Sequence, residues 1–489
     1  MQTSRIDTWL TELSKASNGS DNLPVYSPFD GTVIANIKTN GYDWLENALT
    51  VAHRTFRDRQ AWIPLDERIG ILERCARIMA KHHAELVALA VAEGGKPIVD
   101  SQIEVTRAVE SVRLCAEHLK NDTGNVVPMS TASGGRYATT RYEPIGVVAA
   151  VSAFNHPLNL IAHQVAPAIA AGCPVIVKPA AVTPLSCLRF VEILKQAGLP
   201  EHWVQVLITD DNDLAEQLVT DSRVGFFSFI GSARVGWMLR SKLAPGVRCA
   251  LEHGGAAPVI LAQDADVERA IEAILKGGFY HAGQVCVSVQ RVFVPDAMAH
   301  EFATQLAARA AQLETGDPMS VNTQVGPLIS TQEVERVHSW VSEAIAEGAS
   351  CMTGGEPING RFYPCTVLLN PPSDAKVSQL EIFGPVVNVY SYRALPDAIA
   401  AANSLPYAFQ AAVFSQDMNT IMHTFAHIDA SAVMVNDHSA FRIDSMPFAG
   451  LRESGLGVGG IPYTLDDMRV EKMLVLNDVE AATNWNRAK

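Results

Sequence analysis

The sequence lacks several features that would assign a protein class at once. Its eight cysteines form no CxxC pair and no Cys/His cluster with zinc spacing, so we expect neither a disulfide framework nor a bound metal. The first twenty residues have no signal-peptide core, and no apolar run reaches membrane-spanning length. The formal net charge of -14 argues against nucleic acid or an anionic membrane as the main partner. We therefore expect a cytoplasmic protein.

The chain is rich in apolar residues and in alternating elements. With 489 residues and 48% apolar composition, it is too long for one core, so two or three domains are expected. Helical periodicity covers 43–60 and 66–122, and Gly94-Gly95-Lys96-Pro97 breaks the second stretch. From residue 145 onward, strands alternate with helices. Strands are predicted over 147–151, 174–178, 203–208 and 225–230, and helices over 156–171, 184–197, 213–220 and 233–243.

Strands spaced by helices of this length predict βαβ units and a parallel, doubly wound nucleotide-binding sheet. A second α/β series begins near residue 257, with strands predicted over 258–261, 289–294, 386–390, 411–414 and 432–436. Residues 126–144 alternate loosely around Gly134-Gly135 and predict a hairpin-like excursion. Residues 450–460 are rich in glycine and predict an ordered loop, and the last strand is expected over 472–477.

Cys286 follows a small-residue turn that contains Gly283, and the run 287–294 after it predicts a buried strand. A thiol at the mouth of a turn can be approached by a carbonyl compound. A cysteine taken alone is more often a small buried hydrophobe, so the rest of the chain must decide its role.

Polar residues end several predicted strands, where active sites of this architecture are built. Each segment is a weak signal alone, but they occur together, at 153–157, 177–180, 229–236, 251–255 and 381–385. In this order, and together with Cys286, they resemble the aldehyde dehydrogenase superfamily over essentially the whole chain. The late PFGG and SGxG patterns of that family are matched by 447–450 and 454–457.

The resemblance implies a thiol mechanism. Cys286 matches the nucleophile, which adds to the aldehyde to give a thiohemiacetal that expels hydride to a nicotinamide. The Asn155 amide and the Cys286 backbone N–H match the oxyanion hole. Glu252 matches the base that activates water for thioester hydrolysis, and its presence favours hydrolysis over transfer to coenzyme A.

The resemblance also implies that the cofactor is NAD or NADP. Gly231 and Ser232 match the turn beneath the pyrophosphate, and Lys178 matches the lysine on the adenosine ribose. Glu381 matches the carboxylate on the nicotinamide ribose, and Phe383 matches the ring beside it.

Two departures from the family bear on the choice between NAD and NADP. Ala181 stands where members that prefer NAD commonly have a glutamate, and this change removes repulsion of a 2′-phosphate. The acidic loop 209–213 replaces a glycine-bearing loop and would repel a 2′-phosphate that it faced. The two departures oppose each other, so the preference stays open.

At the substrate end, the resemblance places Arg107, His156, Ser439 and Arg442 near the entry tunnel. Two arginines and a histidine would suit a short aldehyde that carries phosphonate, sulfonate or carboxylate, or one that is hydroxylated. Alternatively, the arginines pair with protein carboxylates and His156 only packs. The AGQVC and FRxDxMPF-like runs resemble the branch that contains lactaldehyde, phosphonoacetaldehyde and semialdehyde dehydrogenases.

The fold that the resemblance implies is α/β, with a Rossmann-like NAD(P)-binding domain over 1–122 and 145–253 and a catalytic domain over 254–445. A β oligomerisation arm is expected over 123–144 and 470–489, and it implies a homodimer or homotetramer. Three other functions stay open. They are a coenzyme-A-acylating semialdehyde dehydrogenase, a broad-specificity dehydrogenase of neutral aldehydes, and a non-catalytic scaffold.

Overall fold

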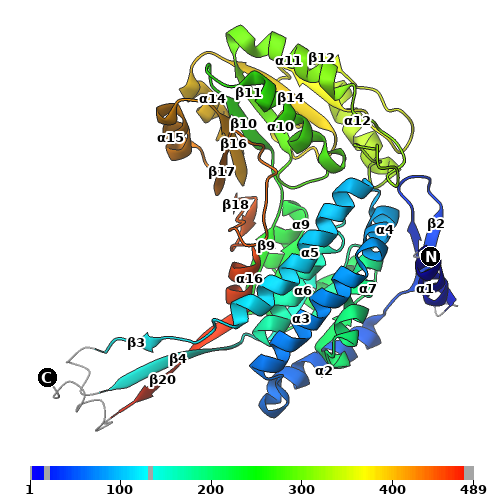
Figure 1. The fold of residues 1–489 in the computed structure, drawn as a ribbon, viewed down its shortest axis with the longest axis vertical. Coiled ribbons are helices and arrows are strands. Elements are labelled where there is room, and N and C mark those ends of the chain that lie inside the picture. Colours follow the sequence, from blue (N-terminus) through cyan, green and yellow to red (C-terminus); the bar gives the residue numbers. More distant parts are fainter. Residues whose placement is uncertain (1–2, 16–21, 130–135, 478–489) are drawn as a thin grey trace.

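The computed structural model describes residues 3–15, 22–129 and 136–477. Two large sheets form two lobes, and a narrow β arm projects from the lower one (Figure 1). The mixed α/β fold class predicted from the sequence is confirmed. The chain opens with α1 (Thr3–Lys15) and an antiparallel hairpin of β1 (Asn22–Tyr26) and β2 (Val33–Lys38).

The six-stranded sheet has the order β19-β9-β8-β5-β6-β7, and only β19 runs antiparallel to its neighbour. Its strands are β5 (Val147–Val151), β6 (Val175–Lys178), β7 (Val204–Val206), β8 (Val224–Ile230), β9 (Arg248–Glu252) and β19 (Gly455–Leu456). The helices around it are α2 (Tyr42–Arg57), α3 (Leu65–Lys81), α4 (His83–Gly94), α5 (Ile98–Leu119), α6 (Asn159–Ala171), α7 (Leu185–Gln196), α8 (Asn212–Thr220), α9 (Ala233–Arg240) and α16 (Ile461–Asp467).

Successive side chains of β5 enter different cores, as the two-residue period of a strand requires. Val148 and Ala150 pack with helices α3, α5, α6 and α7, whereas Val147 and Ala149 pack with α2 and α8. The sheet is therefore covered on both faces, which explains why its strands are almost continuously apolar.

The seven-stranded sheet has the order β12-β13-β14-β11-β10-β16-β17, with only β12 antiparallel to its neighbour. Its strands are β10 (Ala257–Leu261), β11 (Val289–Pro295), β12 (Ser350–Thr353), β13 (Thr366–Leu369), β14 (Val386–Tyr392), β16 (Gln410–Phe414) and β17 (Ala432–Val435). Its helices are α10 (Val267–Phe279), α11 (Asp296–Ala310), α12 (Thr331–Ala346), α13 (Lys376–Gln379), α14 (Leu395–Ala402) and α15 (Met418–His427).

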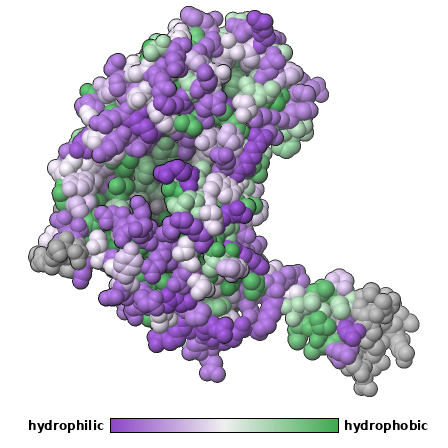
Figure 2. Space-filling view, turned by 180° about the vertical axis from the view of Figure 1, so that it is seen from behind, coloured by the Kyte–Doolittle hydropathy of each residue, from purple (hydrophilic) through white to green (hydrophobic). Residues whose placement is uncertain are grey.

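The projecting arm is an antiparallel sheet of β3 (Val126–Val127), β4 (Tyr137–Pro144) and β20 (Arg469–Leu476), in the order β20-β4-β3. The predicted Gly134-Gly135 turn lies outside the described residues. Met473, Leu474, Val475 and Leu476 are exposed, and Figure 2 shows an apolar patch on the arm.

Several predicted boundaries shift. The stretch 66–122 is three helices, because the chain breaks at His82 as well as at Gly95, which is left-handed with φ 66°. The strand after Cys286 spans Val289–Pro295, which confirms the predicted start at 289 and excludes residues 287 and 288 of the apolar run. The last strand begins earlier than predicted, at Arg469. The glycine-rich loop contains β18 (Leu451–Arg452), which pairs with β15 (Tyr407–Ala408), and it also contains β19. No helix in the described ranges is long and apolar enough to cross a membrane.

Candidate active site

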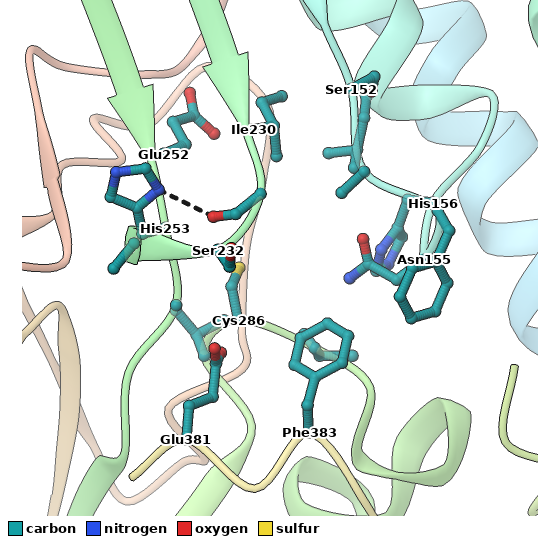
Figure 3. Close-up of a pocket in the computed structure, with 18 of the residues that line it drawn as sticks. Ser152, Asn155, His156, Ile230, Ser232, Glu252, His253, Cys286, Glu381 and Phe383 are labelled. Atoms are coloured by element: carbon teal, nitrogen blue, oxygen red, sulfur yellow. Dashed lines mark hydrogen bonds between the residues drawn. The ribbon is translucent and has the colours of Figure 1, made fainter. Parts of the chain in front are cut away.

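A cavity of about 790 Å³ lies between the two sheets, at the carboxyl ends of β5, β8 and β9 (Figure 3). It is the place where open α/β sheets bind ligands. Ten of the residues singled out from the sequence line it, from both lobes. They are Arg107, Asn155, His156, Gly231, Ser232, Glu252, Cys286, Glu381, Phe383 and Arg442.

Cys286 lies in a turn that is fixed by its own neighbours. His281, Ala282 and Gly283 are consecutive left-handed residues, with φ of 48°, 54° and 70°. A Cβ on Gly283 would stand 2.1 Å from the Gly384 carbonyl oxygen, so only glycine fits there. The buried Gln284 side chain accepts a hydrogen bond from the Ile329 N–H at 2.9 Å and anchors the turn from below.

Asn155 reaches this turn from the end of β5. Its side-chain amide donates a hydrogen bond to the Gln284 carbonyl at 2.8 Å, which fixes the amide beside the Cys286 turn. An amide nitrogen carries two N–H groups, so the second one can serve a ligand in the cavity. Asn155 and Cys286 are therefore brought together as the sequence predicted.

Ser439 supports the same turn from behind. Its hydroxyl donates to the Val287 carbonyl at 2.9 Å, and its side chain is fully buried. Ser439 is not among the residues that line the cavity. The structure thus places it as a support of the Cys286 turn rather than on the tunnel wall expected from the sequence.

The cavity walls withdraw Cys286 and Glu252 from bulk water. Burial raises the pKa of the Cys286 thiol to about 12, and the nearby Arg442 guanidinium opposes this shift. Burial likewise raises the pKa of Glu252, again opposed by Arg442. Glu252 ends β9, and its carboxylate lies where a side chain on Gly459 would be, since a Cβ there would stand 2.2 Å from Oε1.

Glu381 and Phe383 form a second group at the edge of the cavity. The Glu381 Oε1 atom is buried without a hydrogen-bond partner in the described chain, and burial raises the pKa of this carboxyl to about 8. A Cβ on Gly254 would stand only 1.6 Å from Oε1, so glycine leaves the space that the carboxyl occupies. Phe383 packs edge-on against Phe154, with ring centroids 5.8 Å apart.

The Gly231–Ser232 turn opens α9. Ser232 makes no side-chain cap, so the first N–H groups of the helix are available to an anion. His253, to which the sequence assigned no role, holds this turn, because its Nδ1–H donates to the Gly231 carbonyl at 2.8 Å. The ring fills the space beside Gly236, where a Cβ would stand 2.0 Å from its Cε1 atom.

Lys178 ends β6 and Ala181 follows it, and neither belongs to the cavity wall itself. The Lys178 ammonium group donates to the Pro179 carbonyl at 3.4 Å. The Ala181 methyl group packs against an apolar cluster that includes Leu188 and Val206.

The cationic side chains at the substrate end differ in their partners. Arg107 donates to Asp444, which also accepts a hydrogen bond from His163 at 2.8 Å. Arg442 lies over the Phe448 ring at 3.5 Å, and its Nε and Nη2 atoms are buried without a partner among the described residues.

His156 shares a hydrogen bond of 3.2 Å between its Nε2 atom and the Tyr280 hydroxyl. Tyr280 and Asp444 were not singled out from the sequence. Asp444 lies in the FRxDxMPF-like run and Tyr280 lies two residues before the AGQVC run, but neither pattern indicates which side chain they contact.

Comparison with known proteins agrees with this geometry. Residues 15–474 match the family model described as the aldehyde dehydrogenase family. A 3-sulfolactaldehyde dehydrogenase of Priestia megaterium is 39% identical over 414 residues, which cover 84% of this chain and 86% of that protein.

Two solved structures superpose over nearly the whole chain. Aldehyde dehydrogenase 21 from Physcomitrella patens, in complex with the reaction product succinate, is 33% identical with a TM-score of 0.91, and the match covers 95% of this chain and 96% of that one. Glyceraldehyde-3-phosphate dehydrogenase from Methanocaldococcus jannaschii, complexed with NADP, is 31% identical with a TM-score of 0.89, over 94% and 100% of the two chains. The chain belongs to the aldehyde dehydrogenase family, and it is an oxidoreductase that acts on an aldehyde.

Proposed function

We propose that this enzyme oxidises a short anionic aldehyde, best represented by a hydroxylated sulfonate such as 3-sulfolactaldehyde, to the carboxylic acid with NAD or NADP. The observation that carries the proposal is the Arg442 guanidinium in the cavity that holds Cys286. It lies over the Phe448 ring, but its buried Nε and Nη2 atoms have no hydrogen-bond partner among the described residues.

Buried N–H groups without a hydrogen-bond partner cost free energy, and a bound anion would relieve that cost. Arg442 can offer Nε and Nη2 to a sulfonate or carboxylate as a pair of charge-assisted hydrogen bonds. The relatives agree, since one is named for a sulfonated aldehyde and another was solved with succinate.

Arg107 has a secondary role in this proposal. Its Nε and Nη2 atoms are already hydrogen-bonded to Asp444. Arg107 therefore acts on the substrate anion mainly through long-range electrostatic attraction and through its remaining N–H groups. His156, next to Asn155 and bonded to Tyr280, is positioned to contact a hydroxyl group on the substrate.

In the proposed reaction Glu252 first takes the proton of the Cys286 thiol and passes it to solvent. The thiolate then adds to the aldehyde carbon, and the Asn155 amide and the Cys286 N–H stabilise the oxyanion. When bound, NAD or NADP supplies the hydride acceptor. Glu252 then takes a proton from water, which attacks the Cys286 thioester and releases the acid and the thiol. Overall, aldehyde, oxidised cofactor and water give acid, reduced cofactor and a proton.

Several groups of this chain fit the cofactor. The free Oε1 of Glu381 suits ribose hydroxyls, and the bare Gly254 leaves room beside it. The uncapped start of α9 at Gly231 and Ser232 suits a pyrophosphate.

We also propose the domain division 1–122 and 145–253 for the cofactor, 254–445 for catalysis, and 123–144 with 470–489 for oligomerisation. Two sheet edges that are unpaired within the described ranges support a homodimer or homotetramer. The edge strand β20 exposes four apolar residues, and β17 ends the seven-stranded sheet. An exposed edge of this kind invites pairing with another chain.

The test is reduced-cofactor formation at 340 nm with matched aldehydes that carry sulfonate, carboxylate, phosphonate or no charge, each with both cofactors. We expect a large preference for one anion in kcat/KM. Arg442→Met should lower the ratio of anionic to neutral kcat/KM about 100-fold, the equivalent of losing charge-assisted hydrogen bonds.

Arg57→Met, at the end of α2 and outside the cavity lining, is the matched control. A wild-type enzyme that prefers neutral aldehydes, or an Arg442→Met variant with an unchanged ratio, would contradict the proposal.

A further inference from the structure

The loop between β7 and α8 lies beside Lys178, and its acidic residues face different ways. The parallel strands β6 and β7 are paired at Val177 and Val206, and the Leu207 N–H donates to the Val177 carbonyl at 2.9 Å. The chain segments that leave the two strands therefore emerge side by side. This inference rests on the proposed function and on the resemblance to the family, which assigns Lys178 to the adenosine ribose.

The loop is held in one conformation. Asn40 and Ile208 exchange two hydrogen bonds, from the Asn40 N–H to the Ile208 carbonyl and from the Ile208 N–H to the Asn40 side chain, both at 2.8 Å. The Asp211 N–H donates to the Thr209 hydroxyl at 3.0 Å. A side chain at position 210 therefore projects from a fixed backbone.

Asp211 is used within the fold. Its Oδ1 atom caps α8 by accepting from the N–H groups of Asp213 at 2.9 Å and Leu214 at 3.4 Å. Its Oδ2 atom accepts from the Tyr42 hydroxyl at 3.5 Å. Asp213 faces the same side as Asp211, since the charges of both raise the pKa of Tyr42.

Asp210 lies near the end of β6, because it follows β7 and Lys178 ends the neighbouring parallel strand β6. In agreement with this placement, the charge of Asp210 acts on the Lys178 ammonium group and opposes the fall in pKa that burial causes. The Asp210 side chain is exposed. Its carboxylate accepts no hydrogen bond from the described residues, in contrast to that of Asp211. A free carboxylate therefore lies next to the lysine that serves the adenosine ribose.

Position 181 offers no such group, because the Ala181 methyl is packed into the apolar cluster described above. We propose that Asp210 makes this enzyme select NAD over NADP, by accepting a hydrogen bond from the ribose 2′-hydroxyl and repelling a 2′-phosphate. The Asp210 charge also offsets part of the attraction that the Lys178 ammonium group would exert on a 2′-phosphate.

The proposal separates this chain from its relative that was solved with NADP. Alanine in place of glutamate at position 181 would by itself favour NADP, because it removes a carboxylate that repels the 2′-phosphate. In this structure the Asp210 carboxylate, which follows the neighbouring strand β7, discriminates between NAD and NADP in place of a glutamate at position 181.

The test is isothermal titration of NAD+ and NADP+ into the full-length enzyme without aldehyde, for the wild type and for Asp210→Asn and Asp210→Ser. The wild type should bind NAD+ at least tenfold more tightly than NADP+. Both variants should reduce that ratio about tenfold, mainly by gaining NADP+ affinity. Higher salt should reduce the wild-type ratio, because the repulsion at an exposed site is screened.

Asp213→Asn is the matched control, since it removes one negative charge from the same loop on the side of Tyr42. It should leave the ratio within about twofold of the wild type. Equal binding of both nucleotides by the wild type, or equal ratios in the position 210 and 213 variants, would overturn the proposal.

The titration needs no aldehyde, so its outcome is independent of the substrate panel. A flat aldehyde profile with NAD+ selectivity intact would overturn only the proposed substrate. Binding of neither nucleotide would instead overturn the cofactor site on which both proposals rest.

Discussion

Arg107 and Asp444, which are 337 residues apart, form a two-point ion pair, with Nε 3.1 Å from Oδ2 and Nη2 2.7 Å from Oδ1. Asp444 is buried, and its hydrogen bonds from His163 and Arg107 hold its pKa well below the usual range, despite burial. The pair ties α5 to the loop that carries Arg442.

Asp444→Asn should lower the melting temperature at neutral pH by about 5 °C, because a buried guanidinium loses its counter-charge, at a cost of about 3 kcal/mol. Arg107→Met combined with Asp444→Asn should cost less than the sum of the two single changes. Differential scanning fluorimetry of the four proteins measures this. Strictly additive shifts would show that the pair is not coupled.

Cys286 should react slowly with iodoacetamide at neutral pH. Its thiol pKa of about 12 leaves little thiolate at pH 7, so the labelling rate should rise about tenfold per pH unit up to pH 9. The exposed Cys351 is changed to serine in all samples to remove background, and Cys286→Ser sets the baseline. Arg442→Met should label more slowly, because it removes the charge that favours the thiolate. A rate independent of pH would contradict the buried, protonated thiol.

Glu252→Gln should separate hydride transfer from hydrolysis. We expect a burst of one equivalent of reduced cofactor per active site. Steady-state turnover after the burst should be about 10²–10³-fold slower than in the wild type. Hydroxylamine, which cleaves thioesters, should restore turnover. A slow variant without a burst would show instead that the loss of Glu252 slows thiol deprotonation more than hydrolysis.

Glu381 should make stability depend on pH. Its folded pKa of about 8 lies above the model-peptide value, so the unfolded chain ionises first as pH rises. Stability from this group is complete below about pH 4.5 and is lost as pH rises toward 8, at about 1 kcal/mol per pH unit. Glu381→Gln removes this dependence. The melting temperature of the Glu381→Gln variant minus that of the wild type should therefore increase from pH 5 to pH 8. A difference that stays constant over this range would contradict the raised pKa of Glu381.

Much of the fold could be predicted, because the strands of both sheets are apolar runs between helices of sufficient length. The boundaries could not. Periodicity continues across His82, where the break between α3 and α4 has no glycine or proline to mark it. The residues after Cys286 are β-branched, yet Val287 still belongs to the turn because Ser439 holds its carbonyl.

The site could be predicted as a set of residues but not as a set of contacts. Arg107 and Arg442 are the same residue type, and only tertiary structure shows that Arg107 has a carboxylate partner while the Nε and Nη2 atoms of Arg442 have no hydrogen-bond partner among the described residues. The acids at 210, 211 and 213 likewise look equivalent in sequence. Their directions depend on the cap of α8 and on Tyr42, which lies far earlier in the chain.

Gly459 has a consequence for how this enzyme could change its reaction. The Glu252 carboxylate rests in the volume that a side chain at 459 would fill. An alanine at position 459 would move the Glu252 carboxylate without changing the chemical identity of Glu252, Cys286 or Asn155. A single methyl group at position 459 would therefore slow the attack of water on the acyl-enzyme, and other acyl acceptors would compete better. This substitution is one mutational route from a hydrolytic dehydrogenase to an acyltransferase.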